Sequence, residues 1–351
     1  MIRPVRGSWH GQHVARAEAG RSGGLGDVGR VGGWSSRAGP FLATLAILLA
    51  GAVPASAHGT ADELPPLDPQ TALTAWSFDP LVTLALVGLG ATYLLAVRAV
   101  NRRHPASPVR PWRSAAWIGG LVVVALALEG SPDVYAGVLF SAHMVQHLLL
   151  TAVAAPLFAL AAPVTLLLRV APPATRGWLV LPILHSRLVG TVGHPVIAWI
   201  LFAGVMWGTH FSPLFDAALE DALTHHVEHA LYLGAAMLFW WPVVAADPIR
   251  HRLGWAARLV YVGAALPWNS FLGVAITFAP QALYPHYATV DRAWGPTPLV
   301  DQQAAGAIMW VGGDLAFLAA LLLLVAGLLS DEERKGRLYD ARMDARAREA
   351  R

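Results

Sequence analysis

Two short motifs combine residue types and spacings that could bind a metal ion. Residues 143–147 read HMVQH, with imidazoles four positions apart, and residues 225–229 read HHVEH, with imidazoles three and four positions apart. Side chains at these spacings lie on one face of an α-helix, one above the other, so two such helices could hold one ion between them. Interhelical hydrogen bonding without a metal is the alternative. The candidate ligands are His143, Met144, His147, His225, His226 and His229.

Other side chains could complete or support this site. Met206 could add a thioether and His210 an imidazole, with packing and hydrogen bonding to water as the alternatives. Asp301, followed by Gln302, could orient a ligating imidazole or cap its own helix. His58 would become the first residue if the chain were cleaved after residue 57, and its amino group and imidazole could then chelate copper.

The residue types limit which metal fits. The 351 residues contain no cysteine, which excludes disulfides, zinc ribbons, cysteine-ligated iron–sulfur clusters and a cysteine nucleophile. The clustered carboxylates of magnesium, calcium or di-iron sites are also lacking. Imidazoles and thioethers suit copper, Cu(I) above all, with zinc or haem iron next. We find no phosphate-binding loop, no basic face for nucleic acid and no catalytic triad, so we expect no enzyme.

The elements that position these residues are membrane helices. A chain that is 56% hydrophobic and 13% charged, with a mean hydropathy of +0.50, has too little polar surface for a soluble globule of this size. Seven apolar stretches are long enough to span a bilayer, which predicts an all-α, multi-pass bundle. Pro156 and Pro163 predict a kink or break in the third stretch. The stretches are residues 81–100, 115–130, 137–168, 194–211, 222–246, 258–280 and 303–329.

The flanking segments suggest how the chain is organised. Residues 1–57 read as an N-terminal extension and signal peptide, 58–80 as an extracytoplasmic segment, 81–330 as the membrane domain and 331–351 as a short, solvated cytoplasmic helix. Eighteen basic residues then fall in the loops and tail on one side and one, Arg292, on the other, which indicates that the N-terminus is outside and the C-terminus inside. Both histidine motifs fall at the outer ends of their helices in this orientation.

The two histidine motifs, together with the stretch from Asp301-Gln302-Gln303 to Trp310, resemble the multispanning CtaG family of cytochrome c oxidase assembly factors. The resemblance covers about residues 70–330 and includes the spacing and the topology. It implies a membrane protein that matures the oxidase, through copper delivery to a subunit. The residues that carry over are His143, Met144, His147, His225, His226, His229, Asp301 and Gln302.

Our hypothesis is therefore a seven-helix protein of the bacterial cytoplasmic membrane that binds copper at its outer face and passes it to a cytochrome c oxidase subunit. Its partners would be oxidase subunits, the lipid bilayer and a copper donor protein, with no nucleic acid. A copper transporter of CopD-like logic, a haem-binding electron-transfer protein and a scaffold without metal are the alternatives.

Overall fold

Several of the described helices begin at residues whose side chains cap them. In the computed structural model, which describes residues 64–349, the Asp79 side chain accepts hydrogen bonds from the backbone N–H groups of Leu81 and Val82. Asp221 and Thr297 cap two later helices in the same way. Caps satisfy backbone donors that a helix leaves unpaired at its start. These polar residues therefore fix where the chain enters the apolar bundle.

The described residues are helical throughout their regular structure and contain no strand, which confirms the predicted all-α class. The first half consists of α2 (Thr71–Thr74), α3 (Pro80–Arg103), α4 (Pro111–Glu129), α5 (Ser131–Ala136), α6 (Phe140–Leu148), η2 (Leu149–Ala154), α7 (Ala155–Ala161), α8 (Pro163–Val170), α9 (Pro173–Thr175), η3 (Arg176–Val180), α10 (Leu181–Leu184) and α11 (Arg187–Val192). The second half consists of α12 (Pro195–His210), α13 (Leu214–Glu220), α14 (Ala222–Val244), α15 (Trp255–Gly263), α16 (Ala265–Thr277), α17 (Pro285–Thr289), α18 (Pro298–Ala307), η4 (Ile308–Gly312) and α19 (Gly313–Glu349).

Six of these helical segments are long and apolar enough to cross a membrane, and a seventh results if α12 and α13, bent by 67° relative to each other, form one span. This agrees with the expected bundle of about seven. Helix α12 alone measures about 24 Å, less than the roughly 30 Å of a bilayer core. Large apolar side chains also face outward along the spans, as lipid contact requires; they include Leu84, Leu95, Val122, Ile200, Val260, Phe271 and Leu322.

The third span is interrupted as the prolines predict. Its backbone passes through the π-helical segment η2, which precedes Pro156, and then breaks at Ala162, whose φ of 53° is left-handed. Pro163 begins α8 directly afterwards. The side chain of Asp247, from beyond the end of α14, accepts hydrogen bonds from Val164 N (3.2 Å) and Thr165 N (2.6 Å) and so caps α8.

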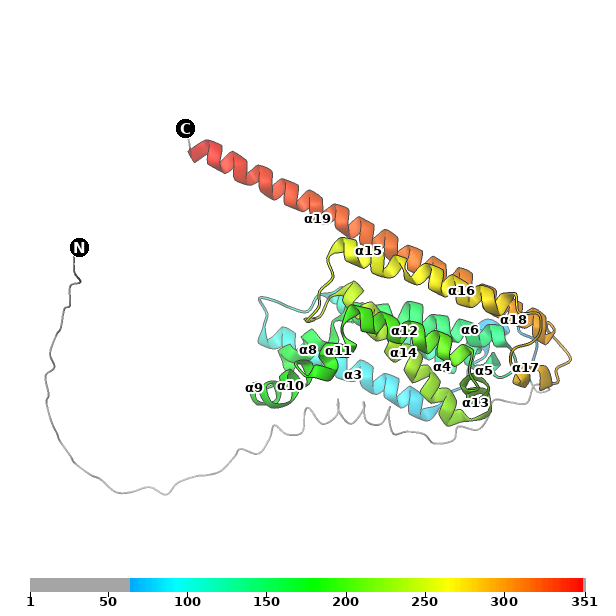
Figure 1. The fold of residues 1–351 in the computed structure, drawn as a ribbon. Coiled ribbons are helices and arrows are strands. Elements are labelled where there is room, and N and C mark those ends of the chain that lie inside the picture. Colours follow the sequence, from blue (N-terminus) through cyan, green and yellow to red (C-terminus); the bar gives the residue numbers. More distant parts are fainter. Residues whose placement is uncertain (1–63, 350–351) are drawn as a thin grey trace, which may run out of the picture. The chain divides into compact units, whose positions relative to one another are not determined.

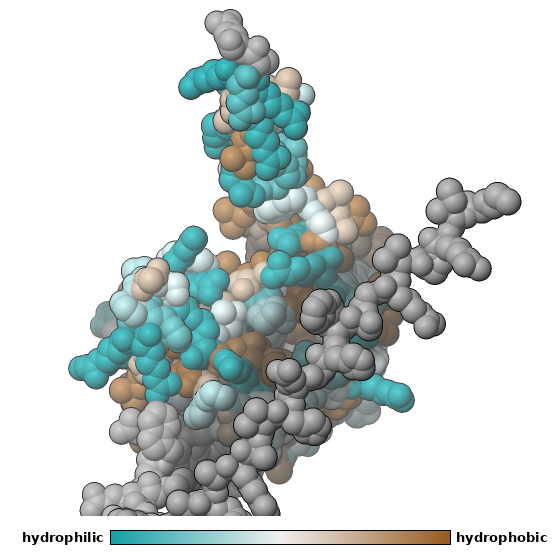
Figure 2. Space-filling model, turned by 90° about the vertical axis from the view of Figure 1, so that its left-hand side faces the viewer, coloured by the Kyte–Doolittle hydropathy of each residue, from teal (hydrophilic) through white to brown (hydrophobic). Residues whose placement is uncertain are grey.

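The tail expected as a short, solvated helix is helical as far as Glu349, and it continues the last span without a break, because α19 runs from Gly313 to Glu349. Asp331 pairs with Arg334 at 2.7 Å and with Lys335 at 3.0 Å, three and four residues away on one face. Pairs at this spacing stabilise a helix. Figure 2 shows that hydrophilic side chains cover the part of α19 that projects from the bundle.

Helix α14 packs against α12 on one side and against η2 and α7 on another, and α4 packs against α7 (Figure 1). Helix α16 lies directly against α18 and η4. The approach is close at Gly273, where an added Cβ would lie 2.6 Å from Trp310 Cβ and 2.8 Å from the Gly306 carbonyl oxygen. These contacts bring the starts of α6 and α14 and the end of α12 to one end of the bundle.

Candidate metal centre

Carboxylates from elsewhere in the fold fix the two helices that carry the histidine motifs. Asp301 on α18 accepts hydrogen bonds from Phe140 N (2.6 Å) and Ser141 Oγ (2.5 Å), and so caps α6. Asp221 accepts bonds from Thr224 N (2.8 Å) and Thr224 Oγ1 (2.6 Å) at the start of α14. The motifs occupy the first two turns of these helices. The two caps therefore determine where both motifs lie along the length of the bundle.

The two motifs meet inside the bundle. His143 and His147 from α6 face Glu228 and His229 from α14, and one ligand atom from each residue lies within 4.8 Å of every other. The exposed fractions of the four residues are 0%, 3%, 1% and 6%. Glu228 Oε2 lies 3.5 Å from His143 Nε2 and 3.8 Å from His147 Nε2. A buried group with three imidazoles and one carboxylate can hold a metal ion.

The hydrogen bonds of His143 show which of its nitrogens is free for a metal. The Tyr287 hydroxyl donates its only proton to the carbonyl oxygen of Ala136 at 2.8 Å, so it accepts from His143 Nδ1 at 3.2 Å. Burial raises the pKa of Tyr287 well above its ordinary value, which keeps the phenol neutral and able to donate. His143 Nδ1 therefore carries a proton, and in the neutral ring the lone pair of Nε2 points to the carboxylate.

Glu228 is a buried carboxylate that faces only the imidazoles of His143 and His147, at 3.5 and 3.8 Å, among the described residues. Neither of its oxygens accepts a hydrogen bond from any residue between 64 and 349. Burying such a charge is costly unless it is paired or coordinates a metal. Its oxygen also faces the Nε2 lone pair of His143, an arrangement that a cation between the two atoms would stabilise.

The distance between these two atoms indicates which kind of cation fits. A proton shared in a charge-assisted hydrogen bond would bring nitrogen and oxygen to about 2.7–2.9 Å. Two ligands that are each about 2.1 Å from one tetrahedral ion lie about 3.4 Å apart. The observed 3.5 Å between His143 Nε2 and Glu228 Oε2 is the separation of two metal ligands.

The remaining nitrogens of the group are also available. His147 Nδ1 and Nε2 and His229 Nε2 are buried and form no hydrogen bond within the described part of the chain. The His147 ring stacks on Tyr232, with ring centroids 4.1 Å apart, which fixes the plane of the imidazole. The buried group therefore supplies imidazole nitrogens and carboxylate oxygens that form no hydrogen bond with other described residues. His143 Nδ1, which bonds to Tyr287, is the exception.

Two further expected residues flank the group. The His225 ring lies 5.2 Å from that of His143 and 4.2 Å from that of His229 between centroids. His210, at the end of α12, donates from Nδ1 to the carbonyl oxygen of Met206 at 2.7 Å and lies 6.0 Å from the His147 ring. Both surround the four ligands without belonging to the group of atoms that lie within 4.8 Å of one another.

Other expected residues lie elsewhere. His226 is exposed on the opposite face of α14 and bonds to the Ala222 carbonyl oxygen. Met144 and Met206 are buried but belong to a neighbouring cavity, described below. Gln302 binds backbone groups, accepting from Leu283 N and donating to the carbonyls of Ile276 and Gln281. His58 lies outside the described residues.

Asp301 takes a role that differs from both expectations. It bonds to no imidazole, and its own helix α18 is capped by Thr297. It caps α6 instead, by accepting a hydrogen bond from the backbone N–H of Phe140, which is 161 residues away in the sequence. It thus supports the site through the backbone of the helix that carries His143.

Glu228 is not among the ligands expected from the sequence, although the signal is present. Positions 225, 228 and 229 share one helical face at spacings of three and four, whereas position 226 points away from 228. A carboxylate on the same face as two imidazoles within an apolar helix is itself a sign of a polar site.

Comparisons with known proteins identify the family of the chain. The family described as "Cytochrome c oxidase caa3 assembly factor (Caa3_CtaG)" matches residues 91–331, a range that contains all four members of the buried group. Uncharacterized proteins of Mycobacterium bovis and Mycobacterium tuberculosis are each 31% identical over 283 residues, and one of Mycobacterium leprae is 29% identical over 280. Each alignment covers 78% of this chain but only 42% of the relative. No solved structure matches.

Proposed function

Because the chain belongs to the family of cytochrome c oxidase caa3 assembly factors, we propose that it binds copper between α6 and α14 and supplies it to an oxidase subunit during assembly. The ligands are His143, His147, Glu228 and His229. The observation that carries the proposal is the buried group itself, in which one ligand atom each from His143, His147, Glu228 and His229 lies within 4.8 Å of the others and His143 Nε2 lies 3.5 Å from Glu228 Oε2.

Copper is favoured over zinc by the ligands and their surroundings. Three imidazoles and a carboxylate suit both metals, but a given site with nitrogen and oxygen ligands binds Cu(II) more tightly than zinc. Thioethers, which suit Cu(I), line the adjoining cavity. A haem is disfavoured, because the cavity beside the buried group measures only about 20 Å³ and has no room for a macrocycle.

The proposal also includes the membrane that holds the protein and the orientation of the protein in it. The basic residues of the loops favour an arrangement in the bacterial cytoplasmic membrane in which the starts of α6 and α14 are at the outer side. Copper would reach the site from a donor protein on that side and leave to the oxidase subunit there. The role is that of a carrier, in which ligands are exchanged and no substrate is chemically converted.

The test compares three proteins purified in detergent and loaded with Cu(I): the wild type, the double variant His143→Ala/His147→Ala, and His226→Ala as the matched control on the exposed face of α14. We expect about one copper per chain in the wild type and the control and none at this site in the double variant. The double variant should also fail to restore oxidase copper in cells that lack the protein. Full copper in the double variant, or binding of zinc alone by the wild type, would contradict the proposal.

A further inference from the structure

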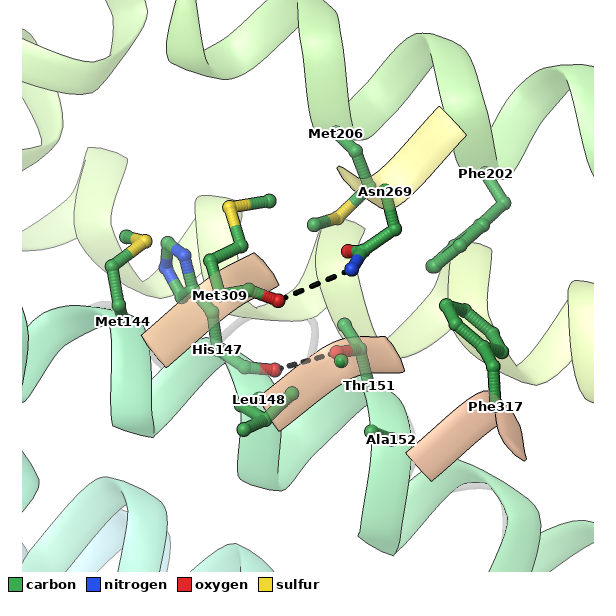
Figure 3. A pocket seen from close by; sticks show the side chains of 11 residues that line it. Met144, His147, Leu148, Thr151, Ala152, Phe202, Met206, Asn269, Met309 and Phe317 are labelled. Atoms are coloured by element: carbon green, nitrogen blue, oxygen red, sulfur yellow. Dashed lines mark hydrogen bonds between the residues drawn. The ribbon is translucent and has the colours of Figure 1, made fainter. Parts of the chain in front are cut away.

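A small cavity next to the metal centre is lined by three thioethers. Met144 of α6, Met206 of α12 and Met309 of η4 contribute to its wall, together with His147 (Figure 3). The three methionines are buried, with exposed fractions of 1%, 8% and 5%. The cavity measures about 20 Å³, and about 10–15 Å³ on this measure is enough for one water molecule. It therefore has room for a single ion.

The composition of this wall differs from ordinary packing. Of the five methionines in the described residues, three line this one cavity, although they come from helical segments far apart in sequence. A methionine that merely fills a gap adapts its shape and closes it. Here three flexible side chains line one cavity, and the cavity stays open.

The backbone around the cavity is also unusual. Thr151 and Ala152 in its wall belong to the π-helical segment η2, and Met309 belongs to the π-helical segment η4. π-Helical turns are rare and are found mostly at functional sites. Two of them, on different spans, border the same cavity.

His147 connects the cavity to the metal centre. Its ring belongs to the buried group with Glu228 and also lines the cavity, and its Nδ1 is buried without a hydrogen bond in residues 64–349. In Figure 3 the His147 imidazole lies beside the side chains of Met144 and Met309. His147 therefore lies between the imidazoles and carboxylate of the buried group and the methionines that line the cavity.

We infer that this cavity is a second ion site, selective for a soft monovalent ion such as Cu(I), to which copper passes from the first site through His147. The inference rests on the proposed function, because it assigns the next position of the same cargo. Thioethers are neutral, soft ligands that suit Cu(I) and bind hard divalent ions weakly. During the transfer, bonds from copper to the Met sulfurs form while its bonds to Glu228, His143 and His229 break and the bond to His147 is kept, with no change in electrons or protons.

This second site would give the carrier selectivity that its first site lacks. Imidazoles and a carboxylate accept zinc as well as copper. An apolar cavity lined by thioethers, Phe202 and Phe317 offers no charge to offset a divalent ion. Zinc would therefore stop at the first site, and only Cu(I) would continue.

The test uses Ag(I), a soft monovalent ion without redox chemistry, as the probe. Binding is measured for the wild type, the triple variant Met144→Leu/Met206→Leu/Met309→Leu, and the control Met237→Leu, whose methionine lies on α14 outside the cavity. Leucine keeps nearly the same volume, which limits the cost to packing. We expect the triple variant to lose at least tenfold in Ag(I) affinity while Zn(II) binding and the gel-filtration profile stay unchanged, and the control to match the wild type.

X-ray absorption of the Cu(I)-loaded proteins adds a structural readout, with sulfur scattering expected in the wild type and absent in the triple variant. Ag(I) affinity equal to that of the wild type in the triple variant would overturn the inference. If the triple variant does not fold, single Met206→Leu and Met309→Leu variants replace it, and unchanged affinity in both would likewise overturn it. Failure of the proposed function would appear separately, as Zn(II) binding that is unchanged when His143 and His147 are alanine, because Zn(II) would bind at the first site alone.

Discussion

Replacement of Glu228 by glutamine tests the metal centre most directly, because it keeps the shape of the side chain and removes only its charge. In the metal-free protein the wild-type carboxylate is 1% exposed and accepts no hydrogen bond from the described residues. An unsatisfied buried polar group costs about 1–3 kcal/mol, and a charged one more. We therefore expect the metal-free Glu228→Gln variant to be more stable than the metal-free wild type by at least about 1 kcal/mol.

Metal binding should reverse this order, so that the wild type becomes more stable than the Glu228→Gln variant. At a free ion concentration 100 times the Kd, binding stabilises the wild type by about 2.7 kcal/mol. Loss even of a residue that only supports the ligands weakens a metal site by about 10- to 100-fold. With a 100-fold weaker site, the same ion concentration would stabilise the variant by only about 0.4 kcal/mol. The assay is thermal unfolding in detergent, with and without Cu(I), followed by tryptophan fluorescence.

Glu129→Gln is the matched control, because Glu129 is also buried, at 4% exposed, but accepts a hydrogen bond from Thr83 in a different part of the bundle. Its stabilisation by metal should equal that of the wild type. Lower metal-free stability of Glu228→Gln would show that Glu228 pairs with a protonated imidazole instead. An unchanged response to metal would show that Glu228 is not a ligand.

Three further predictions concern the ligands and their supports. His229→Ala should lose bound copper whereas His226→Ala retains it, as metal analysis of the purified proteins would show. Asp301→Ala should lower the stability of the metal-free protein by about 0.5–2 kcal/mol, the usual cost of replacing a capping residue by alanine, in thermal unfolding, and an unchanged melting temperature would contradict its role on α6. Gly273→Ala should destabilise the protein by about 1–3 kcal/mol through overpacking against η4, whereas Gly204→Ala, with no heavy atom within 4 Å of the added Cβ, should be neutral in the same assay.

Much of the fold could be predicted from local features of the sequence. The spans follow from apolar length alone, and the break in the third follows from Pro163, which removes a backbone donor. The continuity of the tail with the last span could not be predicted, because charge begins abruptly at Asp331, and a change in polarity resembles a boundary. The backbone responds to helix propensity and to pairs such as Asp331 with Lys335, so the helix continues past the change.

The site was less predictable because it depends on contacts between distant segments. The spacing within residues 225–229 allows either His225 or His226 to share a face with His229, and only the packing of α14 against α12 and α7 decides which face is buried. The role of Asp301 has no local signature at all, since its partner atom on Phe140 lies 161 residues away. The residue types therefore predicted a metal site, but only tertiary packing determines which of the candidate side chains lie together in it.

The position of the metal centre at helix starts has a consequence for how tightly it can hold an ion. Helices α6 and α14 both direct their N-terminal ends, which carry partial positive charge, to the end of the bundle where the ligands lie. This repels a cation, and the carboxylates of Asp301 and Asp221 offset the repulsion at the two caps. A helix end carries about half an elementary charge and each capping carboxylate a full one, so the two caps remove the repulsion that α6 and α14 would otherwise exert on a cation. Replacing either carboxylate should therefore weaken metal binding as well as helix capping, which links the support of the helices to the proposed affinity of the site.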